Sequence, residues 1–327
     1  MNTNQNNRSS ALNVIFGGRG GSGEALALEL LRQGKPVRVV NRSGTANLPA
    51  GIEVVRGNLL EPQSLLEAVR GASTLYHSAN VPYMQWEEVL PKMLEGFLAA
   101  GRSSGARLVY VDNLYMYGKN TVNMSEKMPE EPISRKGILR AKLGRRLLEA
   151  HRAGEVQATI ARASDFYGPG VENAMLGTAN FRGLLSGKAL SWAGLLNAPH
   201  ALTFISDLAR ALILLGERAE APGKIWTIPT AQALTGQQYL ELSADIAGVK
   251  PKAFVITRPL LWMSGLFNPM HREFAEMLYQ FQQLFTVDGS HFAQTFGFQP
   301  TPHREALKIT LESLRQSASN VARAQTV

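Results

Sequence analysis

The sequence contains no cysteine among its 327 residues. This absence excludes disulfides, thiolate metal sites, iron–sulfur clusters and cysteine nucleophiles. The six histidines also lack the four-residue spacing that a helical HExxH zinc site requires. We therefore expect no metal in the functional site.

Charged residues are scarce as well, at 18% of the chain, and apolar runs are short. A hydrophobic share of 45% is ordinary for a globular protein, so we expect an ordered chain with a buried core. No apolar run approaches the ~20 residues of a membrane helix, and the start shows no secretory signal. We therefore expect a cytoplasmic location and no membrane as a partner. The net charge of +8 favours an anionic partner without choosing one.

Short β-type runs alternate with amphipathic stretches from residue 12 onwards, which is typical of βαβ units and a parallel sheet. Right-handed crossovers then place helices on both faces of a doubly wound, Rossmann-type α/β fold. The expected strands are 12–16, 36–40, 52–57, 73–79, 107–111 and 156–164, and the expected helices are 24–34, 62–71, 86–105 and 136–151.

This rhythm changes after residue 170, which predicts a second unit. We expect a Rossmann dinucleotide-binding domain at 11–170, to which 203–230 returns, and a smaller α/β substrate lobe made of 171–202 and 231–315. The polar ends, 1–10 and 316–327, are expected to be loose tails.

A glycine-rich loop, GGRGGSG, separates the first strand from the first helix. Glycine at such a place permits a tight turn, close approach of the backbone to a pyrophosphate, and close packing of helix on strand. The start of the next helix presents free N–H groups to the phosphates. The candidate pyrophosphate-binding residues are Gly17, Gly18, Arg19, Gly20, Gly21, Ser22 and Gly23.

The second strand ends in Asn41 and Arg42, where NAD-binding proteins usually have a carboxylate for the ribose hydroxyls. A carboxylate would repel a 2′-phosphate, whereas a guanidinium pairs with it. Arg19 adds a second positive charge nearby. The sequence therefore predicts NADP(H) as the cofactor in preference to NAD(H).

Six motifs in a fixed order make residues 12–315 resemble the extended short-chain dehydrogenase/reductases, the NAD(P)-dependent epimerase/dehydratase family. They are GGRGGSG at 17–23, GNLLE at 57–61, YHSAN at 76–80, DNLYMYG at 112–118, ARASDFYGPG at 161–170 and FISDLARA at 204–211. The resemblance implies that Asn58 and Leu59 lie near the adenine. It also implies that Ala79 and Asn80 line the ribose and nicotinamide, and that the C-terminal lobe binds substrate.

The serine motif of that family is replaced. Its members use Ser/Thr to position the substrate oxygen, Tyr to transfer the proton, and Lys to hold the ribose and lower the pKa of the Tyr. Aligning on Tyr117–Gly118 puts Asp112 and Asn113 where the family has serines.

The Tyr-Lys pair is replaced too. Anchoring on Pro132 and Gly137 puts Lys136 at the tyrosine position and Arg140 at the lysine position, whereas a shifted register retains Lys142 but has no tyrosine either. A YxxxK pattern that begins at Tyr115 lies in the loop after the fifth strand. We interpret it as a coincidence of spacing that still places a tyrosine near the ligand-binding edge of the sheet.

Three functions remain open. The first is hydride transfer between NADP(H) and a small, apolar carbonyl or alcohol. Lys136 would then donate the proton if burial or neighbouring arginines weakened its hold on it, and Asp112 or Asn113 would orient the oxygen. The second is a non-catalytic NADP(H) sensor. The third is nucleic-acid binding by the basic segment 135–146, although no recognition motif accompanies that segment. If the chain is an enzyme, sugar-nucleotide epimerase or dehydratase chemistry is the alternative reaction.

A small-molecule substrate is the expected partner, in an apolar and aromatic pocket. By analogy with the family, we expect Tyr83 and Trp86 over the nicotinamide end, with Tyr117 and Phe166 also lining the substrate.

A homodimer is expected as well, because helices 86–100 and 136–151 match those that pair in the family. The side chains expected to face the partner are Val89, Met93, Leu94, Phe97 and Leu98.

Overall fold

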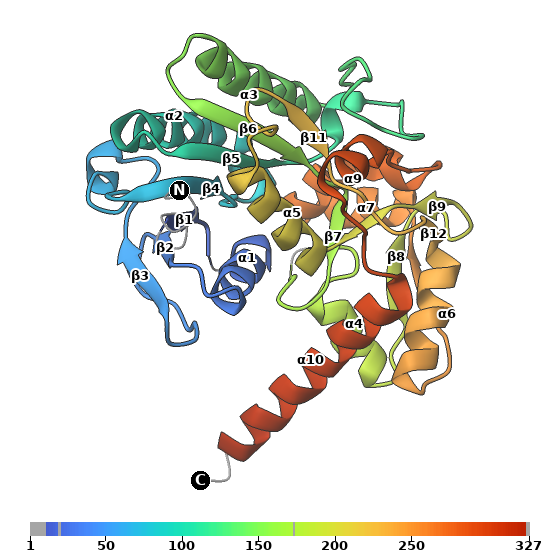
Figure 1. Cartoon of the computed structure of the whole chain (residues 1–327). Helices are drawn as coiled ribbons and strands as arrows, with labels where there is room; N and C mark the ends of the chain where they lie inside the picture. The colour runs from blue at the N-terminus through green and yellow to red at the C-terminus, as the bar shows by residue number, and fades with distance from the viewer. Residues whose placement is uncertain (1–10, 19–20, 173, 325–327) are drawn as a thin grey trace.

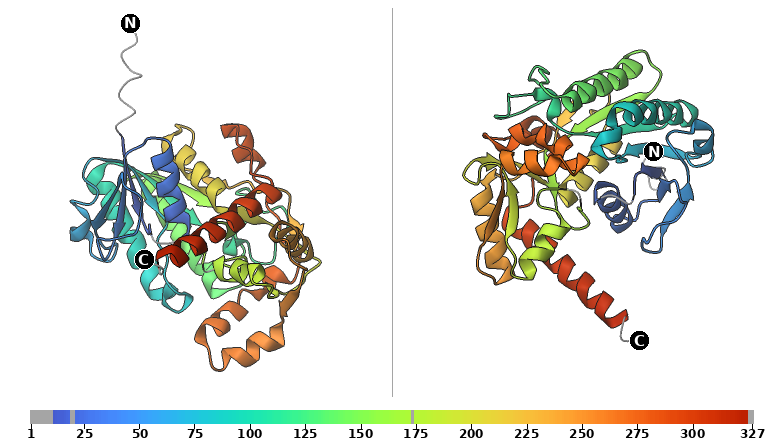
Figure 2. Two further views of the ribbon diagram at one scale, coloured as in Figure 1. Left: turned by 90° about the horizontal axis from the view of Figure 1, so that it is seen from below. Right: turned by 180° about the vertical axis from the view of Figure 1, so that it is seen from behind.

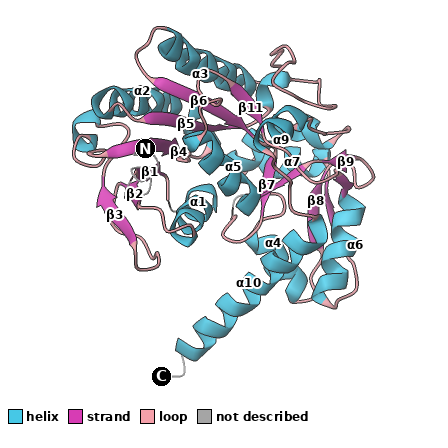
Figure 3. Ribbon diagram, viewed as in Figure 1, coloured by secondary structure: helices cyan, strands magenta, loops and turns pink. Residues whose placement is uncertain are grey.

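A seven-stranded parallel sheet forms the centre of the computed structural model, which describes residues 11–18, 21–172 and 174–324 (Figures 1 and 3). The strand order is β11-β6-β5-β4-β1-β2-β3, with the order reversing between β1 and β4. These strands are β1 (Leu12–Phe16), β2 (Val37–Asn41), β3 (Ile52–Arg56), β4 (Ala72–His77), β5 (Arg107–Asp112), β6 (Gln157–Arg162) and β11 (Ile225–Thr227). The predicted doubly wound α/β fold is confirmed.

Helices cover both faces of this sheet. On one face lie α1 (Gly21–Arg32) and α5 (Ile205–Glu217), with Leu26 and Leu212 fully buried between helix and strands. On the other face lie α2 (Trp86–Ser104) and α3 (Arg135–Arg152). Because both faces are covered, the inner strands are almost continuously apolar rather than alternating.

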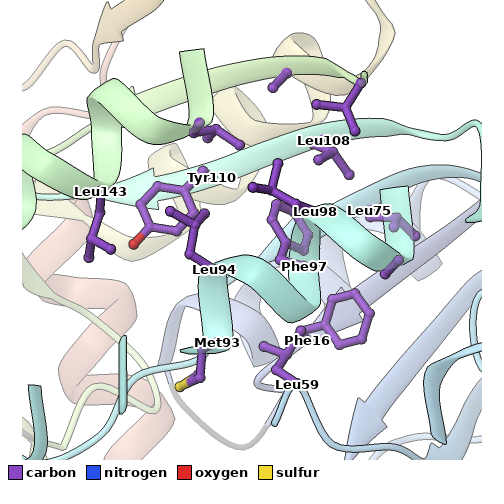
Figure 4. Packing of buried hydrophobic residues seen from close by; sticks show 14 of the residues in the cluster. Phe16, Leu59, Leu75, Met93, Leu94, Phe97, Leu98, Leu108, Tyr110 and Leu143 are labelled. Carbon is purple, nitrogen blue, oxygen red and sulfur yellow. The ribbon is translucent and has the colours of Figure 1, made fainter. Parts of the chain in front are cut away.

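The apolar side of α2 packs on the sheet. Leu94, Phe97 and Leu98 lie against Leu75 and Leu108 of neighbouring strands (Figure 4). The expectation that these apolar residues of α2 face a second protomer is therefore wrong, because they cover one face of the sheet of their own chain. Met93, Leu94, Phe97 and Leu98 are all buried and Val89 is half-buried. The dimer itself stays a prediction.

Besides the central sheet, the described residues form small strand pairs and further helices. The strand pairs are β7 (Asp165–Tyr167) with β10 (Leu202–Phe204), β8 (Leu190–Ala193) with β13 (Ala253–Ile256), and β9 (Pro199–His200) with β12 (Leu234–Thr235). The helices are α4 (Thr178–Leu185), α6 (Gly236–Ala247), α7 (Arg258–Gly265), α8 (Pro269–Ala275), α9 (Ser290–Phe296) and α10 (His303–Ala324). Seen from below, the orange α7 and α8 project from the body of the molecule (Figure 2, left).

Two expected segments differ from the structure. The helix expected at 62–71 is only a 3₁₀ helix at Pro62–Leu65 followed by turns. The Ser64 hydroxyl bonds the Glu61 carbonyl and accepts from the Asn58 N–H, and such side-chain bonds compete with a regular helix. The tail expected from residue 316 instead continues α10 to Ala324, because a helix nucleated on a packed face extends at little cost.

Gly96 gives a test of how α2 is seated. A Cβ at this position would lie 1.9 Å from the backbone oxygen of Leu59, so the helix would have to move. We predict that Gly96→Ala lowers the free energy of unfolding by about 2–3 kcal/mol. Gly183→Ala in α4 is the matched control, since its nearest neighbour would be 3.8 Å away, and it should leave stability equal or slightly higher. Urea unfolding measures both variants, and equal stabilities would contradict this packing.

Candidate functional site

The glycine loop is packed so tightly that a side chain would collide with backbone or core. A Cβ on Gly17 would lie 2.5 Å from the Cα of Ala79, and one on Gly23 would lie 2.3 Å from the Gly17 oxygen. A Cβ on Gly18 would lie 2.2 Å from Cγ1 of Val39. The loop thus brings two predicted elements of the cofactor site together, the glycines and Ala79. Arg19 and Gly20 lie outside the described residues.

Helix α1 begins at Gly21 and Ser22, at the edge of the sheet where the strand order reverses. In open α/β sheets ligands bind at this point, and the helix N-terminus favours anions. A loop that we did not predict covers this end. Val171 Cγ2 would lie 2.9 Å from a Cβ on Gly21. Burial, and after it the charge of Glu172, raises the pKa of Glu24 in the same helix turn.

The loop after β2 has a cationic edge. Arg42 is exposed there, and Arg56, also exposed, ends the neighbouring strand opposite Asn41. The Asn41 side chain is occupied by its own turn: its Oδ1 accepts from the Gly44 N–H at 2.7 Å and its Nδ2 donates to the Thr45 carbonyl at 2.9 Å. Asn41 therefore shapes the loop that carries Arg42.

The other predicted cofactor residues have local roles as well. Asn58 Nδ2 donates to Glu61 at 2.8 Å, and Leu59 is buried below α2. Asn80 is exposed, and its Oδ1 accepts from the N–H of Val81 at 3.0 Å.

Two tyrosine hydroxyls meet at the carboxyl edge of the sheet. Tyr83 follows β4 and Tyr115 follows β5, and their Oη atoms are 2.7 Å apart. Burial raises the pKa of Tyr83 to about 12 and that of Tyr115 well above its usual value, while the Arg140 guanidinium acts in the opposite direction on both. Both phenols are therefore protonated at neutral pH, beside a positive charge.

The positive charge belongs to Arg140, which is buried and forms the floor of the site. Arg140 lies 4.3 Å above the ring of Trp86, and its Nη1 is 3.3 Å from the Tyr110 hydroxyl and 3.4 Å from Asp112 Oδ1. Arg162 Nε approaches the second oxygen of Asp112 at 3.7 Å. Burial raises the pKa of Asp112, and the two guanidinium groups oppose that shift.

Lys136 lies in an environment opposite to the expected one. It is buried, but its Nζ contacts Glu273 Oε2 at 2.5 Å and also hydrogen-bonds Glu276, both from α8 or its end. The charged groups that contact its Nζ are therefore carboxylates, and not the arginines expected beside it. Its Nζ is 5.1 Å from the centre of the Tyr83 ring, so Lys136 remains at the rim of the site.

A small cavity of about 50 Å³ opens between these groups. Its lining residues are Tyr83, Met84, Trp86, Glu87, Arg135, Lys136, Leu139 and Glu273. Tyr83 thus connects the cavity to the buried hydroxyl of Tyr115.

Three further predicted residues do not line an open pocket. Tyr117 is fully buried, and its hydroxyl accepts from Arg162 at 2.9 Å, so its expected contact with substrate is wrong. Phe166 is half-buried on β7 against the sheet core. Asn113 accepts from the N–H of Tyr115 at 3.1 Å and so holds the turn that presents that tyrosine.

The basic segment 135–146 is largely neutralised. Arg135 pairs with Glu273, Arg145 with Glu130, and Arg146 with Glu95. Within the described part of the chain, no group of three His, Asp or Glu side chains could hold a metal ion. No described helix has the length and apolar character required to cross a bilayer.

The residues that sequence reasoning missed come from distant segments. Glu273 and Glu276 meet Lys136 across more than 130 positions of chain. An oxygen of Asp165 lies 2.9 Å from His200 Nε2. The charge of Asp165 raises the pKa of Tyr83 and of Tyr115, although burial is the larger cause for both. No local motif signals such long-range pairs.

The model of the NAD dependent epimerase/dehydratase family matches residues 13–228 of the chain. A 104-residue stretch is 33% identical to the 2-alkyl-3-oxoalkanoate reductase of Stenotrophomonas maltophilia. That stretch covers 30% of this chain and 32% of the reductase, so the chain matches about a third of the length of that relative.

Solved structures share the fold at low identity. The dTDP-glucose 4,6-dehydratase of Bacillus anthracis in complex with NAD superposes with a TM-score of 0.77 at 14% identity, over 94% of this chain and 97% of that one. The UDP-glucuronic acid 4-epimerase of Bacillus cereus in complex with UDP-glucuronic acid and NAD gives 0.75 at 15%, over 93% and 99%. The UDP-glucose 4-epimerase of Thermus thermophilus in complex with NAD gives 0.75 at 19%, over 93% and 99%.

His77 offers a pH test of the site floor. Burial first, and then the charge of Arg140, lowers the pKa of His77 to about 3. Between that pH and about 6.5 the unfolded chain takes up a proton that the folded chain excludes, so stability falls as the pH drops. We predict that His77→Phe removes this part of the loss, since its ring neighbours are Phe97 and Tyr110.

Urea unfolding from about pH 7 to about pH 4 measures the effect. The free energy of unfolding of His77→Phe relative to wild type should increase steadily over this range. His271→Gln, at an exposed position on α8, is the control and should show no such trend. A constant difference between His77→Phe and wild type would contradict a neutral, buried imidazole.

Proposed function

Since the chain belongs to the NAD dependent epimerase/dehydratase family, we propose that it transfers a hydride between NADP(H) and a small, apolar carbonyl or alcohol. The single observation that carries this proposal is the Tyr83–Tyr115 hydroxyl pair beside Arg140. It supplies a protonated acid and a nearby positive charge at the edge where the cofactor-binding glycines lie.

The residues present fit a dinucleotide. Only glycine fits where the loop packs on Ala79 and on itself, and a loop without side chains lets a pyrophosphate approach its backbone. The N-terminus of α1 would hold the phosphates, and Ala79 and Asn80 would border the ribose and nicotinamide. When bound, the nicotinamide supplies the hydride for reduction or accepts it for oxidation.

Tyr115 is the proposed proton donor for reduction. As hydride reaches the carbonyl carbon, the carbonyl oxygen gains negative charge and takes the proton of Tyr115 Oη, giving the alcohol. Arg140 stabilises the phenolate that remains, which is the role that the lysine has in the family. Tyr83 then returns a proton through its 2.7 Å hydrogen bond and is itself reprotonated from the cavity beside Lys136.

Lys136 has a different proposed role. Through its two carboxylate partners, it holds α8 over the cavity. Arg140 takes the role of the family's lysine at the floor of the site. We predict no hydrogen bond from Arg140 to the substrate.

The substrate class is an oxo compound with an alkyl portion. The matched reductase is by name specific for a 2-alkyl-3-oxoalkanoate. The structures with the same fold include enzymes complexed with sugar nucleotides, whose pyrophosphate would require cationic side chains in the C-terminal lobe. Arg182, Arg258 and Arg272 are the arginines after residue 170 that could take this role. All three are exposed on the surface, which favours the apolar substrate.

Tyr115→Phe tests the proton donor. We predict that NADPH oxidation with medium-chain ketones and 3-oxo acids falls by ~10²–10⁴ in kcat while the Kd for NADPH is unchanged. Tyr117→Phe is the matched control because it also deletes a buried phenol on the same turn, and it should keep at least most of the turnover. Lys136→Met should retain kcat within about tenfold if its role is to hold α8.

Other results would overturn the assignment. Full activity of Tyr115→Phe, together with loss of activity in Lys136→Met, would make Lys136 the proton donor. Turnover of UDP-sugars but of no ketone would replace the substrate class. Tight NADPH binding without turnover of any compound would favour a sensor.

Arg42→Ala tests the choice of cofactor. Loss of a charge-assisted contact to the 2′-phosphate should weaken NADPH by about 1.5–3 kcal/mol and leave NADH nearly unchanged. Arg70→Ala, an exposed arginine paired with Glu67, is the control and should change neither. Fluorescence titration measures all four affinities. A wild-type preference for NADH would point to NAD as the cofactor, and equal loss for both cofactors would show that Arg42 does not contact a 2′-phosphate.

A further inference from the structure

The tip formed by residues 258–272, which includes α7 and most of α8, carries a group of exposed large apolar side chains. Phe267 is 90% exposed, Trp262 68% and Leu266 66%. Met263 and Met270 of the same tip are exposed as well. Large apolar residues scattered singly over a surface are normal, but such a group marks an interaction site.

The exposed apolar side chains lie on α7 and on the turn that follows it. Trp262 and Met263 belong to α7, which ends at Gly265, and Leu266 and Phe267 follow in a turn at helical spacing. The opposite side is already used, since Leu261 and Gly265 are buried and Leu261 packs with Leu278 and Phe281 of the lobe. The outward face is therefore not required by the core of the chain.

Two cations lie on the tip itself. Residues 258–272 contain no aspartate or glutamate. Arg258, at the start of α7, and Arg272, in the last turn of α8, are both exposed. A face with tryptophan, phenylalanine and leucine at its centre and cations around it complements the surface of an anionic bilayer, where apolar groups insert and cations meet the headgroups.

We propose that the tip docks on anionic lipid bilayers as a peripheral, surface-bound contact. The sequence predicts no membrane partner because it has no run long enough to span one, but surface docking requires no such run. Trp262, Leu266 and Phe267 enter the headgroup region, and Arg258 and Arg272 pair with lipid phosphates.

Docking at this place also concerns the substrate, a consequence that rests on the proposed function. The same helix α8 carries Glu273, which lines the cavity beside Tyr83 and holds Lys136. A tip in the bilayer therefore places the entrance of the site at the lipid surface. An oxo compound with an alkyl portion would reach Tyr115 from the lipid rather than from water.

Trp262 makes the docking measurable in the full chain. The other three tryptophans, Trp86, Trp192 and Trp226, are at most 2% exposed, so a solvent-dependent change in emission reports Trp262. Vesicles of phosphatidylcholine with about one third phosphatidylglycerol should shift the emission to the blue and sediment the protein, and high salt should reverse both. Pure phosphatidylcholine vesicles should bind far more weakly.

Variants separate the two components of binding. Arg258→Gln/Arg272→Gln should weaken partitioning onto the anionic vesicles about 30-fold, and Phe267→Ser should weaken it while retaining Trp262 as reporter. Leu66→Ser/Arg70→Gln changes an exposed leucine and an exposed arginine elsewhere, and should bind as wild type does. Circular dichroism should show all variants folded.

Three outcomes would overturn the proposal. One is no emission shift and no sedimentation with any vesicle. Another is light scattering that shows a dimer which Phe267→Ser dissociates, because the tip would then bind a second copy. The third is an increase in KM for a soluble ketone in Phe267→Ser with no vesicle binding by wild type, which would make the tip a substrate cover. Vesicle binding is measured without turnover, so it can succeed even where the proposed reductase activity fails.

Discussion

The buried contact between Arg140 and Asp112 is the constraint on which the candidate site depends. Both side chains are buried, so each charge is stabilised by the other, and removing one partner of such a pair typically costs about 3–5 kcal/mol. The pair joins α3 to the end of β5 and fixes a positive charge below Trp86, Tyr83 and Tyr115. Arg162 and Glu130 extend the network to β6. The position of the tyrosine pair follows from this floor.

The second constraint is steric and lies one strand away. Gly17, Gly23 and Ala79 pack backbone against backbone at the reversal of strand order, so only glycine fits in the loop. The glycine loop and the charged floor are joined by the segment from Ala79 to Tyr83. A cofactor at the glycine loop and an acid at the charged floor would therefore be held close together by the five residues of chain between them. Under the proposed function, this arrangement would serve hydride transfer although the Ser, Tyr and Lys positions of the family are replaced.

Much of the fold could be predicted from sequence because its signals are local. The LNVIF strand, the glycine loop and the alternating segments each specify their own structure within a few residues. The floor of the site could be predicted only in part. Arg140 and Asp112 were found by register, but the partners of Lys136 lie on α8, and only the folded chain brings Glu273 and Glu276 to it. Tyr117 was misassigned because a motif does not show which side of its turn faces the core.

The central claim is that Tyr115 Oη, and not Lys136 Nζ, meets the oxygen of the substrate. A crystal structure of the chain with NADP⁺ and a bound medium-chain ketone tests it directly. The account predicts the carbonyl oxygen at hydrogen-bonding distance from Tyr115 Oη, about 2.6–3.2 Å, with Lys136 still held by its two glutamates. A carbonyl oxygen bonded to Lys136 Nζ, with Tyr115 turned away from the ketone, would contradict it.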